Sequence, residues 1–298
     1  MGGARVRAGA CSWADKSLVA SGEFYPRRTM SAADRLRWYC SQLPLAEITA
    51  TYRFPPTPEL AAQWAARTPD GFVFDVRAWS LLTGNPTFPD SLWPDLQASL
   101  RPANRERRRL YPHHLPAEVF EECWDRFAHA LRPLQRAGRL GAVVLTFPAW
   151  FSPRPGAWAE LAAAPRRMEG FPLAVELHHP GWFEGDGCHA TLEFLEEHDL
   201  ALVCLDGPPS GPRALPPVVA ATAQLSMVRM CGRRQVGDEP WTWPYRYRDD
   251  ELMEWVPTIA ELATSADDVH VLMDNGWRSD AVDGARTLLG LMAGPPAR

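Results

Sequence analysis

The chain has 298 residues, which exceeds the usual length of a domain, although α/β barrels commonly reach this length as one domain. A hydrophobic content of 46% and a charged content of 22% provide enough material for a large core. The net charge of −5 argues against a broad nucleic-acid-binding surface, which needs an excess of positive charge. We therefore expect residues 1–298 to form a single domain.

Eight short apolar runs predict β-strands, and segments of helical character separate them. The strands are expected at residues 6–12, 45–51, 71–77, 141–147, 171–178, 200–206, 224–231 and 269–274. Helices are expected at 31–43, 55–67, 117–137, 156–167, 189–198, 250–264 and 279–292, with a short helix at most over 218–222. This alternation predicts a parallel (β/α)8 TIM-type barrel. No Gly-x-Gly-x-x-Gly motif follows the first strand, which argues against a doubly wound sheet.

Two connections are longer than a barrel requires. Residues 79–115 contain Trp79, Trp93 and an arginine-rich stretch at 105–109, and residues 232–249 contain Trp241, Trp243, Tyr245 and Tyr247. Long loops at the carboxyl ends of barrel strands often form lids or substrate walls. The alternative for 79–115 is a solvent-exposed, partly disordered insertion, and the aromatic residues of 232–249 could stack on a ligand or simply cover the barrel mouth.

The segments between the strands contain no run of about 18 apolar residues, and no secretory signal pattern opens the chain. The six cysteines form no Cys-x-x-Cys pair, as is typical of a reduced compartment. We expect a cytoplasmic protein that does not insert into a membrane.

Polar residues end most of the strands, where a TIM barrel places its active site. Side chains two residues apart share a strand face, so Glu47, Thr49 and Thr51 are expected on one face. The same alternation predicts that further polar side chains point into the barrel: Asp75, Arg77, Glu176, His178, Asp206, Arg229, Cys231, His270 and Asp274. Charges inside a barrel are costly unless they are paired.

Three interpretations of this set compete. The first is a buried ion-pair network that stabilises packing, especially for Asp75 and His270. The second is an acid/base site without a metal, in which a carboxylate takes a proton and an arginine holds an anionic group. The third is a metal site, for which the candidate ligands are His178, Glu176, Asp206, Cys231 and Asp274. No His-x-His or His-Glu-x-x-His motif supports the metal, and a nucleophilic Cys231–His178 pair is less favoured because a cysteine on a strand is usually inert.

Several segments resemble motifs of one family. They are residues 9–13 (Gly-Ala-Cys-Ser-Trp), 24–26, 47–52, 64 with 68–74, 80–84, 174–182, 228–233 and 270–275. Together they resemble the YecE-like family, domain of unknown function 72, and look most like its actinobacterial branch. The resemblance covers nearly the whole chain in the right order. It implies a TIM-type barrel and no particular reaction, because the general activity of the family is unassigned.

Several polar positions differ from the family pattern. The changed positions are Thr49 (usually Asp or Asn), Arg53 (Tyr), Arg77 (Lys), Asn85 (His), His178 (Arg), Cys231 (His) and Asp274 (Asn). The retained ones are Ser12, Trp13, Glu47, Thr51, Thr83, Glu176, His179, Trp182, Asp206, Arg229, Arg233 and Asn275. Because most replacements are still chemically functional residue types, the resemblance favours a repurposed site over a lost one.

We therefore predict an enzyme that acts on a small or medium polar substrate, such as an anionic or aromatic one, by metal-free acid/base chemistry. Glu176 is the predicted general acid/base, assisted by His178, while Arg229 and Arg77 hold negative charge and Glu47 orients an arginine. Trp13 and Trp182 are expected to form apolar walls. The other predicted binding residues are Ser12, Thr51, His179, Asp206, Cys231, Arg233, Asp274 and Asn275.

Three alternatives remain open. The barrel could bind a ligand or partner without catalysis, or it could be a metal-dependent hydrolase or lyase. Nucleic-acid binding through residues 105–109 is the least favoured alternative, because the whole chain is acidic.

Overall fold

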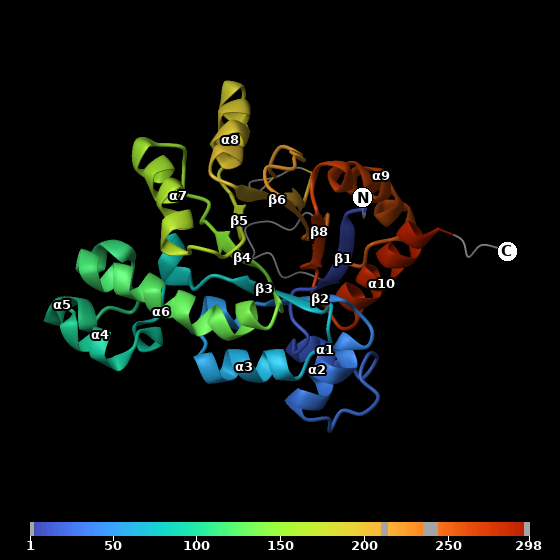
Figure 1. The fold of residues 1–298 in the computed structure, drawn as a ribbon, viewed down its shortest axis with the longest axis horizontal. Helices are drawn as coiled ribbons and strands as arrows, with labels where there is room; N and C mark the ends of the chain where they lie inside the picture. Colours follow the sequence, from blue (N-terminus) through green and yellow to red (C-terminus); the bar gives the residue numbers. More distant parts are fainter. Residues whose placement is uncertain (1–2, 210–213, 235–243, 295–298) are drawn as a thin grey trace.

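Eight parallel strands close into a barrel in the order β1 to β8, which confirms the predicted TIM-type fold (Figure 1). The computed structural model describes residues 3–209, 214–234 and 244–294. The strands are β1 Arg5–Ala10, β2 Leu45–Ile48, β3 Val73–Arg77, β4 Leu140–Thr146, β5 Leu173–Glu176, β6 Leu200–Asp206, β7 Leu225–Met230 and β8 Asp268–Met273. The barrel closes where β1 pairs with β8 over six positions.

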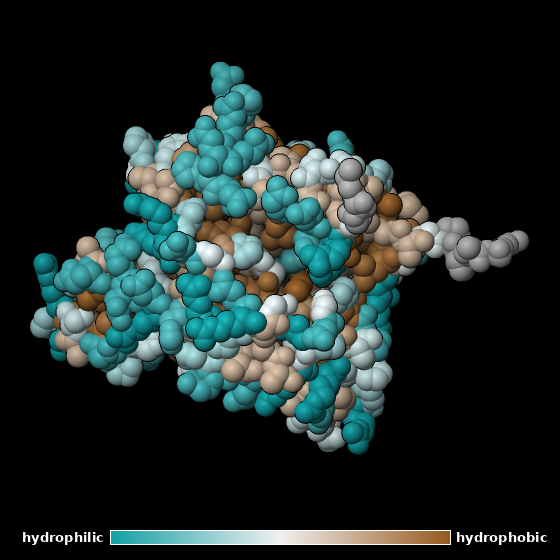
Figure 2. Space-filling model, viewed as in Figure 1, coloured by the Kyte–Doolittle hydropathy of each residue, from teal (hydrophilic) through white to brown (hydrophobic). Residues whose placement is uncertain are grey.

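Helices surround the barrel, and each long helix buries an apolar stripe against the strands. They are α1 Lys16–Ser21, α2 Ala32–Cys40, α3 Pro58–Ala66, α4 Pro94–Ser99, α5 Pro102–Arg105, α6 Ala117–Arg136, α7 Pro155–Arg167, α8 Asp186–Glu197, α9 Asp249–Ser265 and α10 Asp280–Ala293. Figure 2 shows hydrophilic residues over α8 and hydrophobic residues towards the middle of this face of the molecule. Among the described residues, none of the helices combines the length and apolar character that a membrane span requires.

The short helix predicted at 218–222 is wrong. Residues 214–222 are not helical, and the Thr222 hydroxyl holds this segment against β6. It accepts from the Leu202 amide at 2.8 Å and donates to the Leu200 carbonyl at 2.7 Å. These side-chain bonds to a neighbouring strand outweigh the weak helical preference of a segment that begins with two prolines.

β2 and β5 end three and two residues earlier than predicted, because the chain turns sharply at the barrel mouth, and β1 also ends two residues early, at Ala10. After β2 ends at Ile48, residues Ala50–Tyr52 form the 3₁₀ helix η1, and after β5 ends at Glu176, Pro180–Trp182 form the 3₁₀ helix η5. Thr49 and Thr51 therefore do not share a strand face with Glu47, which corrects the prediction. His178 and His179 likewise lie beyond the end of β5.

Residues 79–115 form an ordered unit, so the alternative of a disordered insertion is wrong. The unit contains three 3₁₀ helices, Ser80–Thr83 (η2), Pro89–Ser91 (η3) and Pro112–His114 (η4), together with α4 and α5. Trp79 is fully buried, and its indole N–H donates to the Ser91 hydroxyl at 3.2 Å. In Figure 1, α4 and α5 lie beside α6 at one side of the barrel, where Arg126 of α6 binds Asp95 of α4 at 2.6 Å.

Gly9 allows β1 and β2 to approach each other closely. It is paired with Leu45, and a Cβ atom at this position would collide with the Leu45 carbonyl oxygen, which is backbone and cannot rotate away. We expect Gly9→Ala to lower the free energy of unfolding by about 2–3 kcal/mol. In the control Gly290→Ala, an exposed position of α10 with open space for a Cβ, stability is expected to rise by roughly 0.5–1 kcal/mol. Urea denaturation measures both, and an equally stable Gly9→Ala would contradict this account.

Candidate functional site

Five charged side chains meet at the carboxyl ends of β2, β3, β5, β7 and β8. We call Glu47, Arg77, Glu176, Arg229 and Asp274 the charged cluster. Arg229 lies at its centre and donates from Nε to Glu176 at 2.6 Å and from Nη2 to Glu47 at 2.7 Å. Its Nη1 lies 3.0 Å from the second Glu47 oxygen and 3.3 Å from Asp274. One guanidinium group thus joins three carboxylates from three strands.

The second arginine completes the charged cluster. Arg77 donates from Nη2 to Glu47 at 3.0 Å and to Asp274 at 3.2 Å. Three carboxylates and two guanidinium groups leave a formal charge of −1. An anionic substrate would have to displace these carboxylates, so the contacts do not support the predicted anion-binding role of Arg77 and Arg229.

The electrostatics of the buried carboxylates bear on the predicted role of Glu176. Burial alone would raise the pKa of Glu176, but Arg229 and the hydrogen bond from His178 outweigh it and hold the pKa far below its usual value. Burial alone would also raise the pKa of Glu47, but Arg229 and Arg77 outweigh this effect, so the pKa of Glu47 is lowered. A general base works best with a pKa near the working pH. Glu176 in this state is a weak proton acceptor.

The side chains of the charged cluster differ in exposure. Glu47, Glu176 and Arg229 are 0%, 3% and 1% exposed, whereas the side chains of Arg77 and Asp274 are 18% and 32% exposed. The last two line a cavity of about 410 Å³, which we call the mouth cavity. Its other polar or reactive lining residues are Cys11, Ser12, Asp15, Thr49, Tyr52, Arg53 and Arg278. Buried charges therefore support two partly exposed charges, Arg77 and Asp274, that a ligand can reach.

The backbone at the end of β1 also points to this cavity. Ser12 has φ 126°, a region that residues other than glycine rarely adopt. Such strain occurs mostly at functional sites. Trp13 follows and packs its ring on Phe74 at a centroid distance of 5.4 Å, while it remains partly exposed.

His178 belongs to the surroundings of the charged cluster. Its Nε2 lies 2.7 Å from Glu176 Oε1, and its side chain is 13% exposed. The carboxylate of Glu176 thus contacts both Arg229 and His178, which fixes the histidine ring.

Two thiols lie close to the charged cluster. Cys11 Sγ is 2.9 Å from Arg229 Nη1, and Cys231 Sγ is 3.9 Å from the Arg229 carbonyl. Burial first, and then the charge of Asp274, raise the pKa of both thiols well above the ordinary value. The reactive thiolate is therefore disfavoured, and the Cys231–His178 nucleophile pair receives no support.

This environment predicts unreactive thiols. At pH 8 we expect Cys11 and Cys231 to react with iodoacetamide much more slowly than free cysteine, because neither is ionised at that pH. Peptide mapping after timed alkylation measures each site separately. Labelling of Cys231 in the folded protein as fast as free cysteine would contradict the prediction and restore the nucleophile hypothesis.

The remaining predicted binding residues lie in other places. Thr51 is buried, with its hydroxyl 2.7 Å from the Ile48 carbonyl and 2.6 Å from that of Arg77, so it joins the ends of β2 and β3. His179 accepts from the Gly181 amide at 3.0 Å. Trp182 is fully buried, and its indole N–H donates to the Phe151 carbonyl at 2.5 Å. With no exposed surface, Trp182 cannot form a substrate wall, which corrects that prediction.

Asp206 and Arg233 form a separate group at the ends of β6 and β7. Arg233 Nε lies 3.1 Å from Asp206, and the Tyr247 hydroxyl donates to Asp206 at 2.7 Å and accepts from the Gly232 amide at 2.8 Å. Asn275 donates to the Tyr245 carbonyl at 2.7 Å. These contacts anchor the described part of the 232–249 connection, whereas Trp241 and Trp243 lie outside the described residues.

Asp75 and His270 pair inside the barrel, as the packing interpretation predicted. Both are buried, and His270 Nδ1 lies 3.0 Å from Asp75. Asp75 also accepts from the Ala142 amide at 2.9 Å, which links β3, β4 and β8.

The geometry gives no further support to the metal site or to nucleic-acid binding through residues 105–109. Within residues 3–209, 214–234 and 244–294, no three His, Cys, Asp or Glu side chains lie in a group that could hold a metal ion. In the 105–109 stretch, Arg105 donates to the Leu100 carbonyl at 2.8 Å, and Arg109 lies 3.8 Å above the Phe88 ring. Arginines that bind their own loop are less available to phosphates.

Sequence reasoning missed Cys11, Asp15, Tyr52 and Arg278 as cavity residues. Cys11 and Tyr52 stand inside the motif segments 9–13 and 47–52, so their position at strand ends was a usable signal. Asp15 and Arg278 come from turns after β1 and β8, whose geometry the sequence does not define.

Comparisons with known proteins agree with this architecture. A family model described as "Protein of unknown function DUF72" matches residues 7–297. The UPF0759 protein YunF of Bacillus subtilis is 27% identical over 294 residues, covering 95% of this chain and 93% of YunF. A DUF72 family crystal structure from Enterococcus faecalis superposes with a TM-score of 0.78 at 20% identity, covering 98% and 97% of the two chains. One from Thermotoga maritima has a TM-score of 0.75 at 20% identity, with 97% and 99% covered.

Proposed function

This chain belongs to the DUF72 family, and from that premise we propose that it is an enzyme whose own side chains perform acid/base chemistry on a small polar substrate in the mouth cavity. The observation that carries the proposal is that Asp274 and Arg77 reach the cavity while buried charges hold both from behind. Buried ion pairs are a poor means of stabilisation, since apolar residues of similar volume often do as well. They are a good means of fixing reactive groups before a substrate arrives.

We assign new roles to the residues of the charged cluster. Asp274 becomes the group that exchanges a proton with the substrate, because it is the most exposed carboxylate of the charged cluster. Glu47 and Glu176 hold the arginines and act as positioning residues. His178 assists through its contact with Glu176.

The charges of the mouth cavity favour a substrate with two distinct ends. The reacting end carries a hydroxyl or amino hydrogen that Asp274 can accept. Arg53 is exposed at the cavity, and no hydrogen bond joins its side chain to another residue in the described part of the chain. Arg53, at a position where the family resemblance implies tyrosine, therefore takes over the anion-binding role predicted for Arg77 and Arg229. Small hydroxy acids and amino acids fit this description.

The test begins with native mass spectrometry of freshly purified protein, followed by incubation with a panel of hydroxy and amino acids and mass analysis of the products. We expect Asp274→Asn to slow turnover by about 10²–10⁴-fold, the contribution of a general acid/base. The matched control is Asp15→Asn. Asp15 also lines the cavity and caps α1, and asparagine keeps the cap. A wild-type rate in Asp274→Asn would overturn the assignment.

A barrel that binds a ligand without catalysis is the second candidate. It is supported by the complete pairing of the charged cluster and by the low pKa of its buried glutamates. Retention of a compound by the wild-type protein with no product after prolonged incubation would favour this candidate.

A further inference from the structure

A second cavity lies away from the charged cluster, between the 79–115 unit and α7. It has a volume of about 660 Å³, and we call it the α7 cavity. Thr83 and Tyr111 of the 79–115 unit line one side, and Trp150, Arg154 and Glu160 line the other. None of these residues belongs to the charged cluster or to the mouth cavity.

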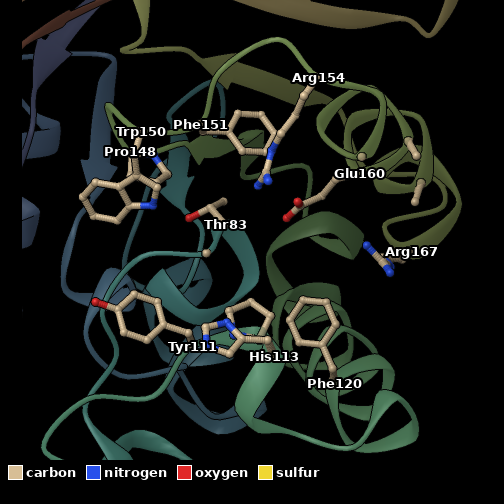
Figure 3. A pocket seen from close by; sticks show the side chains of 15 residues that line it. Thr83, Tyr111, His113, Phe120, Pro148, Trp150, Phe151, Arg154, Glu160 and Arg167 are labelled. Carbon is tan, nitrogen blue, oxygen red and sulfur yellow. The ribbon is translucent and has the colours of Figure 1, made fainter.

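The α7 cavity has two aromatic rings at its mouth. Figure 3 shows Trp150 and Tyr111 on opposite sides, with Thr83 between them. Trp150 is 60% exposed, which makes it the most exposed large hydrophobic side chain among the described residues. A tryptophan so exposed, beside a cavity and opposite a second ring, offers an apolar face for a flat ligand at low entropic cost.

The polar side chains that line the α7 cavity are those of Thr83, Tyr111, His113, Arg154, Glu160 and Arg167, and Arg154 and Glu160 among them offer a charged donor and an acceptor. In Figure 3 the Arg154 guanidinium and the Glu160 carboxylate point into the same space. Neither side chain makes a hydrogen bond to any other residue that the structure describes. Burial raises the pKa of Glu160, and Arg167 and Arg154 only partly offset this. Arg167 itself is already bound to Glu121.

The walls of the α7 cavity are fixed from behind. The Phe151 carbonyl accepts from the buried Trp182, and the Phe151 ring stacks on Phe147 at a centroid distance of 4.2 Å. On the other side, Asn85 Nδ2 donates to the Thr83 hydroxyl at 3.0 Å and to the Thr146 carbonyl at 2.9 Å. A site that is formed before the ligand arrives avoids the cost of ordering its walls.

We propose that the α7 cavity binds a neutral pyranose ring of a mono- or disaccharide, stacked on Trp150 and hydrogen-bonded to Arg154 and Glu160. Hydroxyl groups can accept from a guanidinium and donate to a carboxylate at once. For an anionic ligand, the attraction of Arg154 and Arg167 would be opposed by Glu160, whereas a neutral polyol can use both the donor and the acceptor. The apolar face of a pyranose matches the exposed indole, and a volume of about 660 Å³ accommodates one or two rings. This site is independent of the proposed function of the mouth cavity.

Saturation-transfer NMR with a panel of neutral mono- and disaccharides at millimolar concentration tests the proposal. We expect binding by at least one sugar and an affinity that falls about tenfold in Trp150→Ala, the size of effect expected for a lost stacking contact. Arg154→Met is expected to weaken the same sugar several-fold. The matched control is Trp277→Ala, an exposed tryptophan (46%) that lines neither cavity, with a change of less than about twofold.

The contrary outcomes are equally specific. The proposal is overturned if no sugar of the panel binds to folded protein, or if the sugar binds Trp150→Ala as well as it binds the wild type. The proposal would also be overturned if free nucleobases bound and the sugars did not, and if this binding were lost in Trp150→Ala. The ligand stacked on Trp150 would then be a nucleobase and not a pyranose. Asp274→Asn should leave sugar binding unchanged, which separates this result from any failure at the mouth cavity.

Discussion

Replacing Arg229 with methionine is expected to lower the free energy of unfolding by about 3–5 kcal/mol at pH 7, the cost of leaving a buried charge without its partner. The substitution keeps most of the side-chain volume but removes the group that, alone among the described residues, contacts Glu47, Glu176 and Asp274 together. Arg77 can still bind Glu47, yet within the part of the chain that the structure describes no arginine would remain in contact with Glu176. Chemical denaturation followed by far-UV circular dichroism measures the loss.

The control for this variant is Arg37→Met. Arg37 forms an ion pair with Asp34 on the surface of α2, where both side chains are about half exposed or more. Exposed pairs contribute roughly 0–1 kcal/mol. If Arg229→Met were as stable as Arg37→Met, the charged cluster would not be the buried network described above.

The deficit of Arg229→Met should also depend on pH. Without the guanidinium, the burial that raises the pKa of Glu176 is opposed only by His178 and Arg77 among the groups identified above, so we expect the pKa to rise and the protonated form to be favoured more in the folded state than it is in the wild type. The variant should therefore gain stability relative to the wild type as the pH falls from 7 towards 5. A deficit that stays constant over this range would contradict the electrostatic explanation.

Wild-type stability is expected to fall steeply below about pH 4.5, and this is the second large effect. The pKa values of Glu47 and Glu176 are lowered in the folded protein, so their contribution is fully present above the unfolded pKa of about 4.3 and is lost as the pH falls towards the folded values. Each such group adds a slope of up to about 1.4 kcal/mol per pH unit, or about 2.7 for the pair.

The single variants Glu47→Gln and Glu176→Gln test this linkage. In each variant, about one proton fewer should be taken up when the protein unfolds in acid. The slope of the free energy of unfolding against pH should therefore fall by about 1.4 kcal/mol per pH unit, whatever the stability of the variant at neutral pH. Urea denaturation at a series of pH values from neutral to about 3 gives the slopes. Slopes parallel to that of the wild type in both variants would show that other groups govern acid unfolding.

The fold could be predicted from the sequence because its signals are local and repeated. Eight apolar runs at intervals that fit helical crossovers leave few topologies, and α6, α7 and α9 begin and end within one or two residues of the expected positions. The exact ends of β2 and β5 were missed, because the chain turns into 3₁₀ helices at positions where alternation alone suggests a longer strand.

The members of the site were easier to predict than their roles. Strand alternation correctly predicted that Glu47, Glu176 and Arg229 point to the same place, since each lies in a regular strand. Which partner each charge takes depends on contacts across the barrel between strands far apart in sequence. For this reason the anion-binding role of Arg229 and the wall role of Trp182 could not be judged from alternation. The assignment to the actinobacterial branch stays a prediction.

The pairing of β1 with β8 has a consequence for how the chain reaches its native state. Arg5 contacts Asp268 across 263 residues of sequence, so the barrel cannot close until nearly the whole chain has left the ribosome. Before β7 is in place, Glu47 has only Arg77 and Glu176 has no arginine in contact among the described residues, so burying their carboxylates is less favourable. We expect these carboxylates to stay hydrated in an incomplete barrel. We therefore expect the charged cluster to disfavour closure of a partial barrel, because its ion pairs form only when β2, β3, β5, β7 and β8 are all in place.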